Sequence, residues 1–422
     1  MIEHILDLHI HSKYARACSK DLELATIAAA CETKGITIVS TGDFTHPAWF
    51  RSMEETLEEI GTSGLLRLKS GASPTRFIIG TEISCIYKHR EKTRRLHLLV
   101  FAPNLACAKE FNTRLVARGV NVKSDGRPIM GLSAKEIVNL CVSIDPRMMV
   151  VPAHAWTPWF AVFGSKSGYD SLEECFEELT PEIFAIETGL SSDPPMNHRI
   201  SALDHLTLIS NSDAHSLGNL GREANVFHFE NEADITYEEI RRIIKSGDRK
   251  KFLYTIEFYP EEGMYHYDGH RDCGVSFSPE QTKKNKGICP VCKKSLTIGV
   301  LYRVDSLADR SETDWPKSFI PFRSIIPLRN IIAYVFDVGK ASKKVATEYE
   351  RLIARLGPEF SILLHRPVSE IKREASDPNI ALAIANMRAN NVRLVPGYDG
   401  VYGSADLLVG GRAMAPKQQE LL

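Results

Sequence analysis

Six short apolar runs each carry a histidine or a carboxylate at or near their end, and this repetition restricts the folds that the chain can adopt. The runs lie at residues 5–11, 39–46, 77–82, 96–101, 148–154 and 206–215. Apolar strands that alternate with helical stretches, such as the helix expected at 22–34, indicate βα units and a parallel sheet covered on both faces. In barrels of this kind, functional groups gather at the carboxyl ends of the strands. We therefore expect an α/β barrel in which all six runs converge.

The first run places two imidazoles on one face. His9 and His11 stand two residues apart, and alternate residues of a strand point the same way. The other runs add carboxylates and imidazoles: Asp43, Glu82, His97, His154, Asp213 and His215. Such mixed ligands suit Zn²⁺ or a harder divalent cation. This many candidate ligands predicts more than one metal ion.

The order of these motifs resembles that of the PHP (polymerase and histidinol phosphatase) superfamily. Residues 152–160 and 212–216, and the region that follows the barrel, are most similar to the endonuclease Q family. The resemblance implies a distorted (βα) barrel over residues 1–255 with two to three clustered ions of Zn, Mg or Mn. It also implies hydrolysis of the DNA strand 5′ of deaminated bases (uracil, hypoxanthine) and abasic sites, and damaged DNA as the partner.

Two positions depart from the superfamily pattern. The second motif ends in Asp43, where many members have a histidine. Five or six residues after His11, where another Asp or His is common, the chain has Arg16 and Ala17. Cys18 or Asp21 could substitute for this ligand, or one metal site is weaker or completed by water.

The ligand set carries the expected chemistry. Metal-bound water is a strong nucleophile near neutral pH, and further ions neutralise the phosphate and the leaving oxygen. Glu82 and Asp213 are the expected bridging ligands, because each carboxylate offers two oxygens. His215 or His154 either binds metal or protonates the leaving group, and the sequence leaves both readings open. Glu187, at the end of another apolar run, is expected to contact a metal-binding side chain and orient it without binding the metal itself.

A second metal site is expected after the barrel. Cys289 and Cys292 form a C-x-x-C pair, and His270 and Cys273 form an equally spaced pair upstream. This is the layout of a four-coordinate structural zinc site, with His266 as an alternative fourth ligand. We assign residues 256–300 to this zinc-binding module and residues 301–422 to a mixed, basic α/β domain that binds DNA.

Charge is distributed unevenly along a chain whose formal net charge is −1. Residues 264–422 hold 23 Lys and Arg against 17 Asp and Glu, whereas the remainder holds 29 against 36. Basic side chains cluster in the module, including Lys283 and Lys284, and continue on helices expected at 346–356 and 379–389. The runs 331–336 and 392–395 are expected to be strands. A basic region coupled to an acidic, cation-binding barrel favours a nucleic acid substrate.

The loop 156–160 begins two residues after His154 and holds Trp156 and Trp159. These rings are expected to contact DNA, because an enzyme that selects a damaged base takes it out of the stack. The glycine-rich turn 396–403 is another candidate. For both segments, aromatic packing in a core or a tight turn is an equally good explanation.

Other readings of the chain remain open. A PHP-type phosphatase of small phosphoesters needs the same metal cluster but neither the zinc module nor the basic C-terminal domain, whereas a PHP exonuclease needs both the module and that domain. No window is apolar enough for a membrane helix, and the scattered cysteines suit a cytoplasmic protein. Residues 418–422 lack the aromatic pair of a sliding-clamp peptide, so a sliding-clamp partner is uncertain.

Overall fold

The computed structural model describes residues 3–316 and 318–409. It divides into two compact units. Unit 1 comprises Met1–Glu32, Ile36–Ile256 and Arg303–Phe322, and unit 2 comprises Thr33–Gly35, Glu257–Tyr302 and Arg323–Leu422. Within the described ranges, no helix combines the length and apolar character needed to cross a membrane. Residues 418–422, considered above as a clamp peptide, lie outside the described residues.

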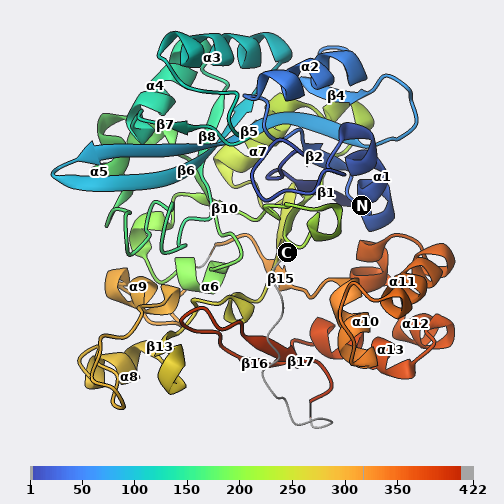
Figure 1. Ribbon diagram of the computed structural model, residues 1–422. Helices are drawn as coiled ribbons and strands as arrows, with labels where there is room; N and C mark the ends of the chain where they lie inside the picture. The colour runs from blue at the N-terminus through green and yellow to red at the C-terminus, as the bar shows by residue number, and fades with distance from the viewer. Residues whose placement is uncertain (1–2, 317, 410–422) are drawn as a thin grey trace. The chain divides into compact units, whose positions relative to one another are not determined.

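Unit 1 is built around a large mixed sheet (Figure 1). Its strands are β1 (Glu3–Asp7), β2 (Ile38–Ser40), β3 (Leu57–Glu59), β4 (Leu65–Leu68), β5 (Arg76–His89), β6 (Lys92–Ala102), β7 (Ile129–Met130), β8 (Met149–Pro152), β9 (Ala185–Glu187), β10 (Thr207–Ile209), β11 (Ala224–His228) and β12 (Phe252–Glu257). Its helices are α1 (Leu24–Lys34), α2 (Pro47–Thr56), α3 (Leu105–Ala117), α4 (Ala134–Ile144), α5 (Leu172–Phe176), α6 (Pro194–Asn197) and α7 (Tyr237–Ser246). Helix α9 (Val300–Leu307) begins in unit 2 and ends in unit 1. Strand β15 (Phe322–Ser324) pairs at the edge of the same sheet.

Seven of these strands close into a ring. β1 pairs with β2, β2 with β5, β5 with β6, and β6 with β8, while β9 pairs with β10. Ala155 N–H donates to the Glu187 carbonyl across 2.9 Å, which joins the end of β8 to β9. His11 N–H donates to the Ala214 carbonyl across 3.1 Å, which joins the segments that follow β1 and β10. The expected distorted barrel is therefore present.

Strand direction explains where the functional groups lie. β1, β2, β5, β8, β9 and β10 run in one direction and β6 runs in the other, because β6 is antiparallel to both of its neighbours. A tight turn at Arg90 and Glu91, both with positive φ, joins β5 to β6 in one long hairpin. The sheet is thus mixed rather than wholly parallel, and six strands still end on the same side of the barrel.

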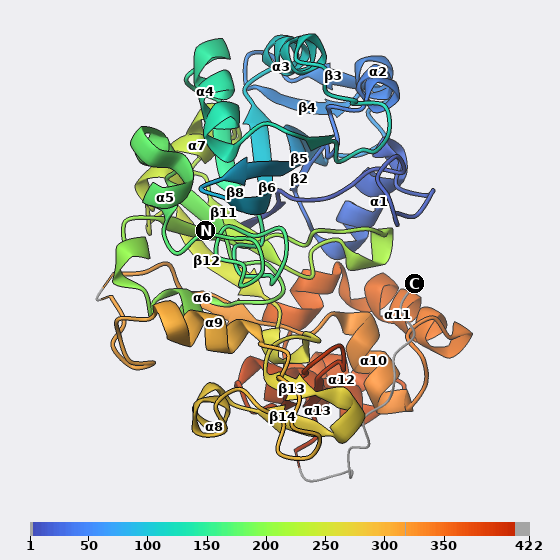
Figure 2. The ribbon, with the colours of Figure 1, turned by 60° about the vertical axis from the view of Figure 1, so that its left-hand side comes forward.

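The barrel core is apolar and tightly covered. Leu6, Ile38, Ile78 and Val151 are buried on the strands and pack in one cluster with the inner face of α7. Helices α3 and α4 pack together on the outside of the strands (Figures 1 and 2). Helix α4 begins with a capping box in which Ser133 and Glu136 satisfy each other's backbone N–H groups. This framework holds the strand ends in place.

Unit 2 contains two small ladders and a group of helices. The first ladder is β13 (Asp268–His270) with β14 (Val275–Phe277), followed by α8 (Pro279–Lys284). The helices are α10 (Leu328–Phe336), α11 (Lys343–Leu356), α12 (Val368–Glu374) and α13 (Pro378–Arg388), with a π-helical turn at Ser361–His365. The second ladder is β16 (Arg393–Val395) with β17 (Ser404–Asp406). The helices expected at 346–356 and 379–389 and the strand expected at 392–395 are confirmed within about three residues at each end.

The strand expected at 331–336 is wrong, because this run lies in helix α10. Its β-branched residues suggested a strand. In the helix, Leu328, Ile331, Ile332 and Val335 are all buried, and their spacing is that of one helical face. Packing of that face therefore outweighs local β propensity.

Candidate metal centre

The barrel brings all eight candidate ligands to one end. His9, His11, Asp43, His154, Asp213 and His215 follow the carboxyl ends of β1, β2, β8 and β10, whereas Glu82 and His97 lie within the β5–β6 hairpin. Asp43, His154 and Asp213 have φ values of 44°, 29° and 46°. Such values are uncommon for residues other than glycine and collect at functional sites.

One group of four side chains surrounds a point beside the first strand. His11 Nε2 lies 3.2 Å from Glu82 Oε2 and 3.1 Å from Asp213 Oδ1. His9 Nε2 lies 3.7 Å and 3.6 Å from the same two oxygens. All four ligand atoms lie within 4.8 Å of one another. Two imidazole nitrogens and two carboxylate oxygens are a donor set that Zn²⁺ and Mn²⁺ accept.

A second group shares the Glu82 carboxylate. Its other oxygen, Oε1, lies 2.7 Å from His97 Nδ1 and 3.1 Å from His154 Nε2. The two ring nitrogens are themselves 3.2 Å apart. One oxygen of Glu82 thus faces each group, which is the arrangement of a carboxylate that bridges two metal ions.

Two further carboxylates contact the Nδ1 atoms of His9 and His11, the two histidines that follow β1. Glu187 lies 3.1 Å from His9 Nδ1, and Asp43 Oδ1 lies 3.0 Å from His11 Nδ1. Asp43 Oδ2 also accepts from the Ser12 N–H at 2.6 Å. Carboxylates in this position fix the tautomer of a metal-binding histidine and direct its Nε2 toward the ion. Glu187 therefore has the contacts expected of a supporting residue, and Asp43 has the same relationship to His11.

Electrostatics at the centre are dominated by close pairs. Burial opposes a charge on His9 and His11, but nearby carboxylates, led by Glu187 for His9 and Asp43 for His11, raise the pKa of each well above its ordinary value. Burial opposes ionisation of Glu82, yet His97 and Arg127 hold its pKa well below the usual range. Burial lowers the pKa of His97 to about 4. Positive charge beside these carboxylates is thus favoured at His9 and His11, whereas burial favours the neutral form of His97.

One buried ring nitrogen supports the fit of this donor set to divalent cations. His9 Nε2 is buried and, among the described residues, has no hydrogen-bond partner. A buried ring nitrogen without a partner is costly, and this one faces the oxygens of Glu82 and Asp213. A divalent ion would satisfy it.

His215 lies beside the first group without belonging to it. Its ring centroid is 4.6 Å from that of His11, and its Nδ1 lies 2.9 Å from the Asp213 carbonyl. Its side chain is 29% exposed, compared with 0% for His11.

Cys18 is half-buried near the same ligands, with its pKa raised to about 12 by burial. Asp21 is exposed and accepts from Ser19. In the parts of the chain that are described, neither Cys18 nor Asp21 joins a ligand group.

Arg127 is a site residue that sequence reasoning missed. Its Nη1 donates to Glu82 Oε2 at 3.0 Å. The residue lies in a loop between α3 and α4 that carries no recognisable motif. Its position could only be found from the fold, because nothing in its local sequence marks it.

The two tryptophans after His154 have different environments. Trp156 is 1% exposed, and its indole N–H donates to Asn197 Oδ1 at 2.8 Å. The expectation that Trp156 contacts DNA is therefore wrong, since its ring packs in the core against Phe163. Trp159 is 42% exposed, and the next residue, Phe160, packs its ring on His97 with centroids 4.7 Å apart. Trp159 is thus an exposed ring near the centre.

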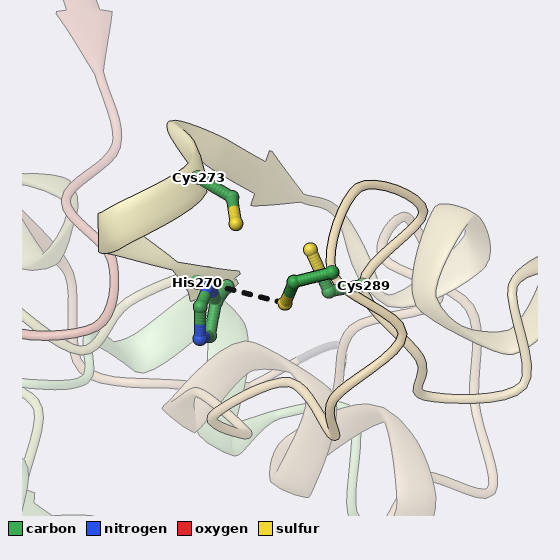
Figure 3. A group of neighbouring side chains, drawn as sticks. His270, Cys273 and Cys289 are labelled. Atoms are coloured by element: carbon green, nitrogen blue, oxygen red, sulfur yellow. Dashed lines mark hydrogen bonds between the residues drawn. The ribbon is translucent and has the colours of Figure 1, made fainter.

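The second expected metal site is also assembled. His270, Cys273, Cys289 and Cys292 offer ligand atoms within 4.8 Å of one another. Figure 3 shows the sulfur atoms and the imidazole of His270 pointing toward a common space, and Cys292 Sγ lies 3.8 Å from His270 Nδ1. His266 is buried against Tyr267 and is not part of this group. Of the two histidines, His270 is the one whose ring nitrogen lies beside the three sulfur atoms, and these four side chains have the composition of a structural zinc site.

The segment 256–300, which is expected to bind zinc, exposes its lysines. Lys283 and Lys284 lie in the last turn of α8 and are exposed, as are Lys286, Lys293 and Lys294. Arg351, Arg355, Lys343, Lys344, Lys372 and Arg373 are likewise exposed on α11 and α12. The turn 396–403 is tied down by backbone bonds, including Gly397 N–H to the Glu261 carbonyl at 2.8 Å. That turn has a structural role in unit 2.

Comparison with known proteins shows which family these features belong to. The family model of the MJ0043 C-terminal domain matches residues 327–391. Uncharacterized protein MJ0043 of Methanocaldococcus jannaschii is 31% identical over 274 residues, which is 63% of this chain and 33% of that protein. The chain thus spans about a third of the length of this archaeal relative. Uncharacterized protein YqxK of Bacillus subtilis is 30% identical over 412 residues, covering 94% of this chain and 97% of that protein.

Two solved structures match over nearly the full length. The lesion-specific endonuclease PfuEndoQ from Pyrococcus furiosus superposes with a TM-score of 0.84 at 31% identity, covering 97% of this chain and 98% of that chain. Endonuclease Q in complex with a 27-mer duplex substrate, with an abasic lesion at the active site, superposes with a TM-score of 0.82 at 30% identity and the same coverage. The chain belongs to the endonuclease Q family.

Proposed function

We propose that this chain is a metal-dependent endodeoxyribonuclease that cuts a DNA strand 5′ of abasic sites and of the deaminated bases uracil and hypoxanthine. The observation that carries the proposal is the Glu82 carboxylate, whose two oxygens face two separate ligand groups. Its support comes from the full-length similarity to endonuclease Q with an abasic duplex. Metal-bridging carboxylates of this kind serve phosphodiester hydrolysis.

His9, His11, Glu82 and Asp213 would hold one ion, and Glu82, His97 and His154 a second. Divalent ions in such a site activate water and neutralise charge on the phosphate. Asp43 and Glu187 keep the first-strand imidazoles in the tautomer that leaves Nε2 free for the ion.

His215 is the proposed proton donor to the leaving oxygen. Its Nδ1–H donates to the Asp213 carbonyl, so Nε2 of the doubly protonated ring is the nitrogen that would give its proton to the leaving oxygen. It is also more exposed than His9, His11 and His97, as a group that meets substrate must be. A histidine is a suitable general acid near neutral pH.

Unit 2 supplies the proposed contacts to the DNA backbone. The exposed lysines of the zinc module, Lys283 and Lys284 among them, are suited to phosphate oxygens, and zinc at His270, Cys273, Cys289 and Cys292 would keep the module folded. Trp159 would stack on bases at the lesion, since base stacking on an aromatic ring needs an exposed face.

The test uses end-labelled duplexes and the metal-loaded full chain. Four duplexes of one sequence carry an abasic site, deoxyuridine, deoxyinosine or no lesion at the same position. A single nick immediately 5′ of each lesion, with the undamaged duplex intact, supports the proposal. A ladder that starts at the strand end identifies an exonuclease, and release of terminal phosphate alone identifies a phosphatase. Either result would overturn the assignment.

A further inference from the structure

We propose that Arg127 binds a non-bridging oxygen of the scissile phosphate and supplies the positive charge that a third metal ion would otherwise contribute. The inference rests on the proposed function, because it assumes a phosphodiester substrate. Arg127 Nη1 lies 3.0 Å from Glu82 Oε2, the oxygen that the first ligand group uses. Its guanidinium therefore stands at the metal centre itself.

The loop that carries Arg127 is held rigidly around the centre. Gly126 N–H donates to the Tyr14 carbonyl at 3.1 Å, and Thr45 Oγ1 donates to the Gly126 carbonyl at 3.2 Å. Ser84 N–H, on β5, donates to the Pro128 carbonyl at 3.0 Å. A Cβ atom at position 126 would lie 2.4 Å from Asp43 Oδ2, so only glycine fits there. The backbone on both sides of Arg127 is thus fixed against three elements of the barrel.

Arg127 also has the exposure of a group that meets substrate. Its side chain is 24% exposed, whereas Glu82 beneath it is fully buried. A guanidinium carries a permanent charge and a planar set of donors that matches the oxygens of a phosphate. One of its N–H groups is engaged by Glu82, and the exposed part of the fork remains to bind an anion.

The same side of the centre is short of metal ligands. The segment after His11 presents Arg16 and Ala17 where another ligand is common in the superfamily, and neither side chain binds a divalent ion. Among the described residues of the barrel there are two ligand groups, and both depend on Glu82. A fixed cation at Arg127 and two ions at these groups would together place as many positively charged centres here as the upper number of ions, three, that the resemblance to the superfamily implies.

The first experiment measures the number of bound metal ions and the affinity for an anion, independently of cleavage. Bound metal is counted by mass spectrometry in the parent, Arg127→Ala, Arg127→Lys and a control, Arg16→Ala, which removes an exposed charge from the neighbouring segment. Inorganic phosphate is then titrated into each metal-loaded protein by calorimetry. We expect two barrel ions in every protein, and phosphate binding at least about ten-fold weaker in Arg127→Ala alone.

The second experiment measures cleavage in single-turnover reactions with the abasic duplex and with bis(p-nitrophenyl) phosphate. Arg127→Ala is expected to lower the maximal rate by about 10²–10³ on both substrates, and Arg127→Lys is expected to recover part of the loss. If the parent cleaves only the small diester, the lesion assignment fails while the role of Arg127 is still measured. A third barrel ion in the parent, loss of ions in Arg127→Ala, or unchanged phosphate affinity would overturn the inference.

Discussion

Glu187 lies directly behind His9, with both of its carboxylate oxygens 3.1 Å from His9 Nδ1. The same carboxylate accepts from His154 N–H at 2.7 Å and from Asn211 Nδ2 at 2.8 Å. One buried side chain thus orients a histidine of the first ligand group and fixes the backbone of a histidine in the second. The two groups are therefore coupled through Glu187 as well as through Glu82.

Glu187→Gln should weaken metal binding in the barrel. The amide replaces one acceptor oxygen by an NH₂ group, which donates hydrogen bonds and cannot accept them. The remaining oxygen cannot serve His9, the His154 N–H and Asn211 together, so His9 loses its fixed orientation. Loss of such a supporting carboxylate costs about 10–100-fold in metal affinity. Competition with a chelating dye measures this effect, and Glu173→Gln, an exposed acid on α5, is the control. Parental affinity in Glu187→Gln would contradict the supporting role.

Substitution of the two tryptophans of the 156–160 loop should have different effects: loss of Trp156 should lower stability, and loss of Trp159 should lower lesion recognition. Trp156→Ala removes a buried ring and an indole hydrogen bond, and should lower the free energy of unfolding by about 3–5 kcal/mol. Trp159→Ala should change that free energy by less than about 0.5 kcal/mol and reduce the preference for abasic over undamaged DNA. Denaturation curves and competitive binding measure both quantities. Unchanged discrimination in Trp159→Ala would remove this ring from lesion recognition.

Zinc should hold the module of unit 2 together. Its own buried core consists of Val275, Cys289 and Leu296 with a few partly buried neighbours, which is too little apolar area for independent stability. Cys292→Ser should therefore lose one equivalent of zinc and open the segment 257–302 to protease. Cys107→Ser, at a thiol outside both clusters, should retain the metal and the resistance. Full zinc content in Cys292→Ser would exclude it as a ligand.

A partly buried acid makes unit 2 sensitive to pH. Burial and then Glu261 raise the pKa of Glu262 to about 8. The folded protein therefore keeps this proton up to about pH 8, whereas the unfolded chain releases it near the ordinary value of about 4.3. Stability is thus lost as pH rises between these values.

Glu262→Gln should remove that loss. The variant should match the parent near pH 4 and exceed it by roughly 2–4 kcal/mol in free energy of unfolding at pH 9. Glu280→Gln, an exposed acid on α8, should follow the parent at every pH. Chemical denaturation across this range decides the matter, and a constant difference between Glu262→Gln and the parent would show that Glu262 ionises normally.

Sequence patterns located most of the metal centre because its residues lie in or just after apolar strands. Apolar runs that deliver their ligands to one side of a barrel leave few other arrangements, so His9, Glu82 and Asp213 were identifiable together. The paired spacing of His270, Cys273, Cys289 and Cys292 was equally informative. Both signals are local in the sequence.

Other features depend on tertiary contacts that no local pattern records. Arg127 lies in an ordinary loop, and only the fold brings it to Glu82. The reversal of β6 follows from a two-residue turn within a long hairpin, and Ile331 lies in a helix because one face of α10 is buried. Trp156 and Trp159 look alike in the sequence, but the core accommodates only the first.

The most direct test of the metal-dependent nuclease assignment is cleavage of one abasic duplex by the parent and by Glu82→Gln, each stripped of metal and then reloaded with Mn²⁺. Glu82→Gln keeps the volume of the side chain but weakens the shared ligand of both groups. The account predicts that the reloaded parent nicks the duplex 5′ of the lesion and that Glu82→Gln binds the duplex with similar affinity but cuts it at least about 10³-fold more slowly. Cleavage by Glu82→Gln at the parental rate would contradict it.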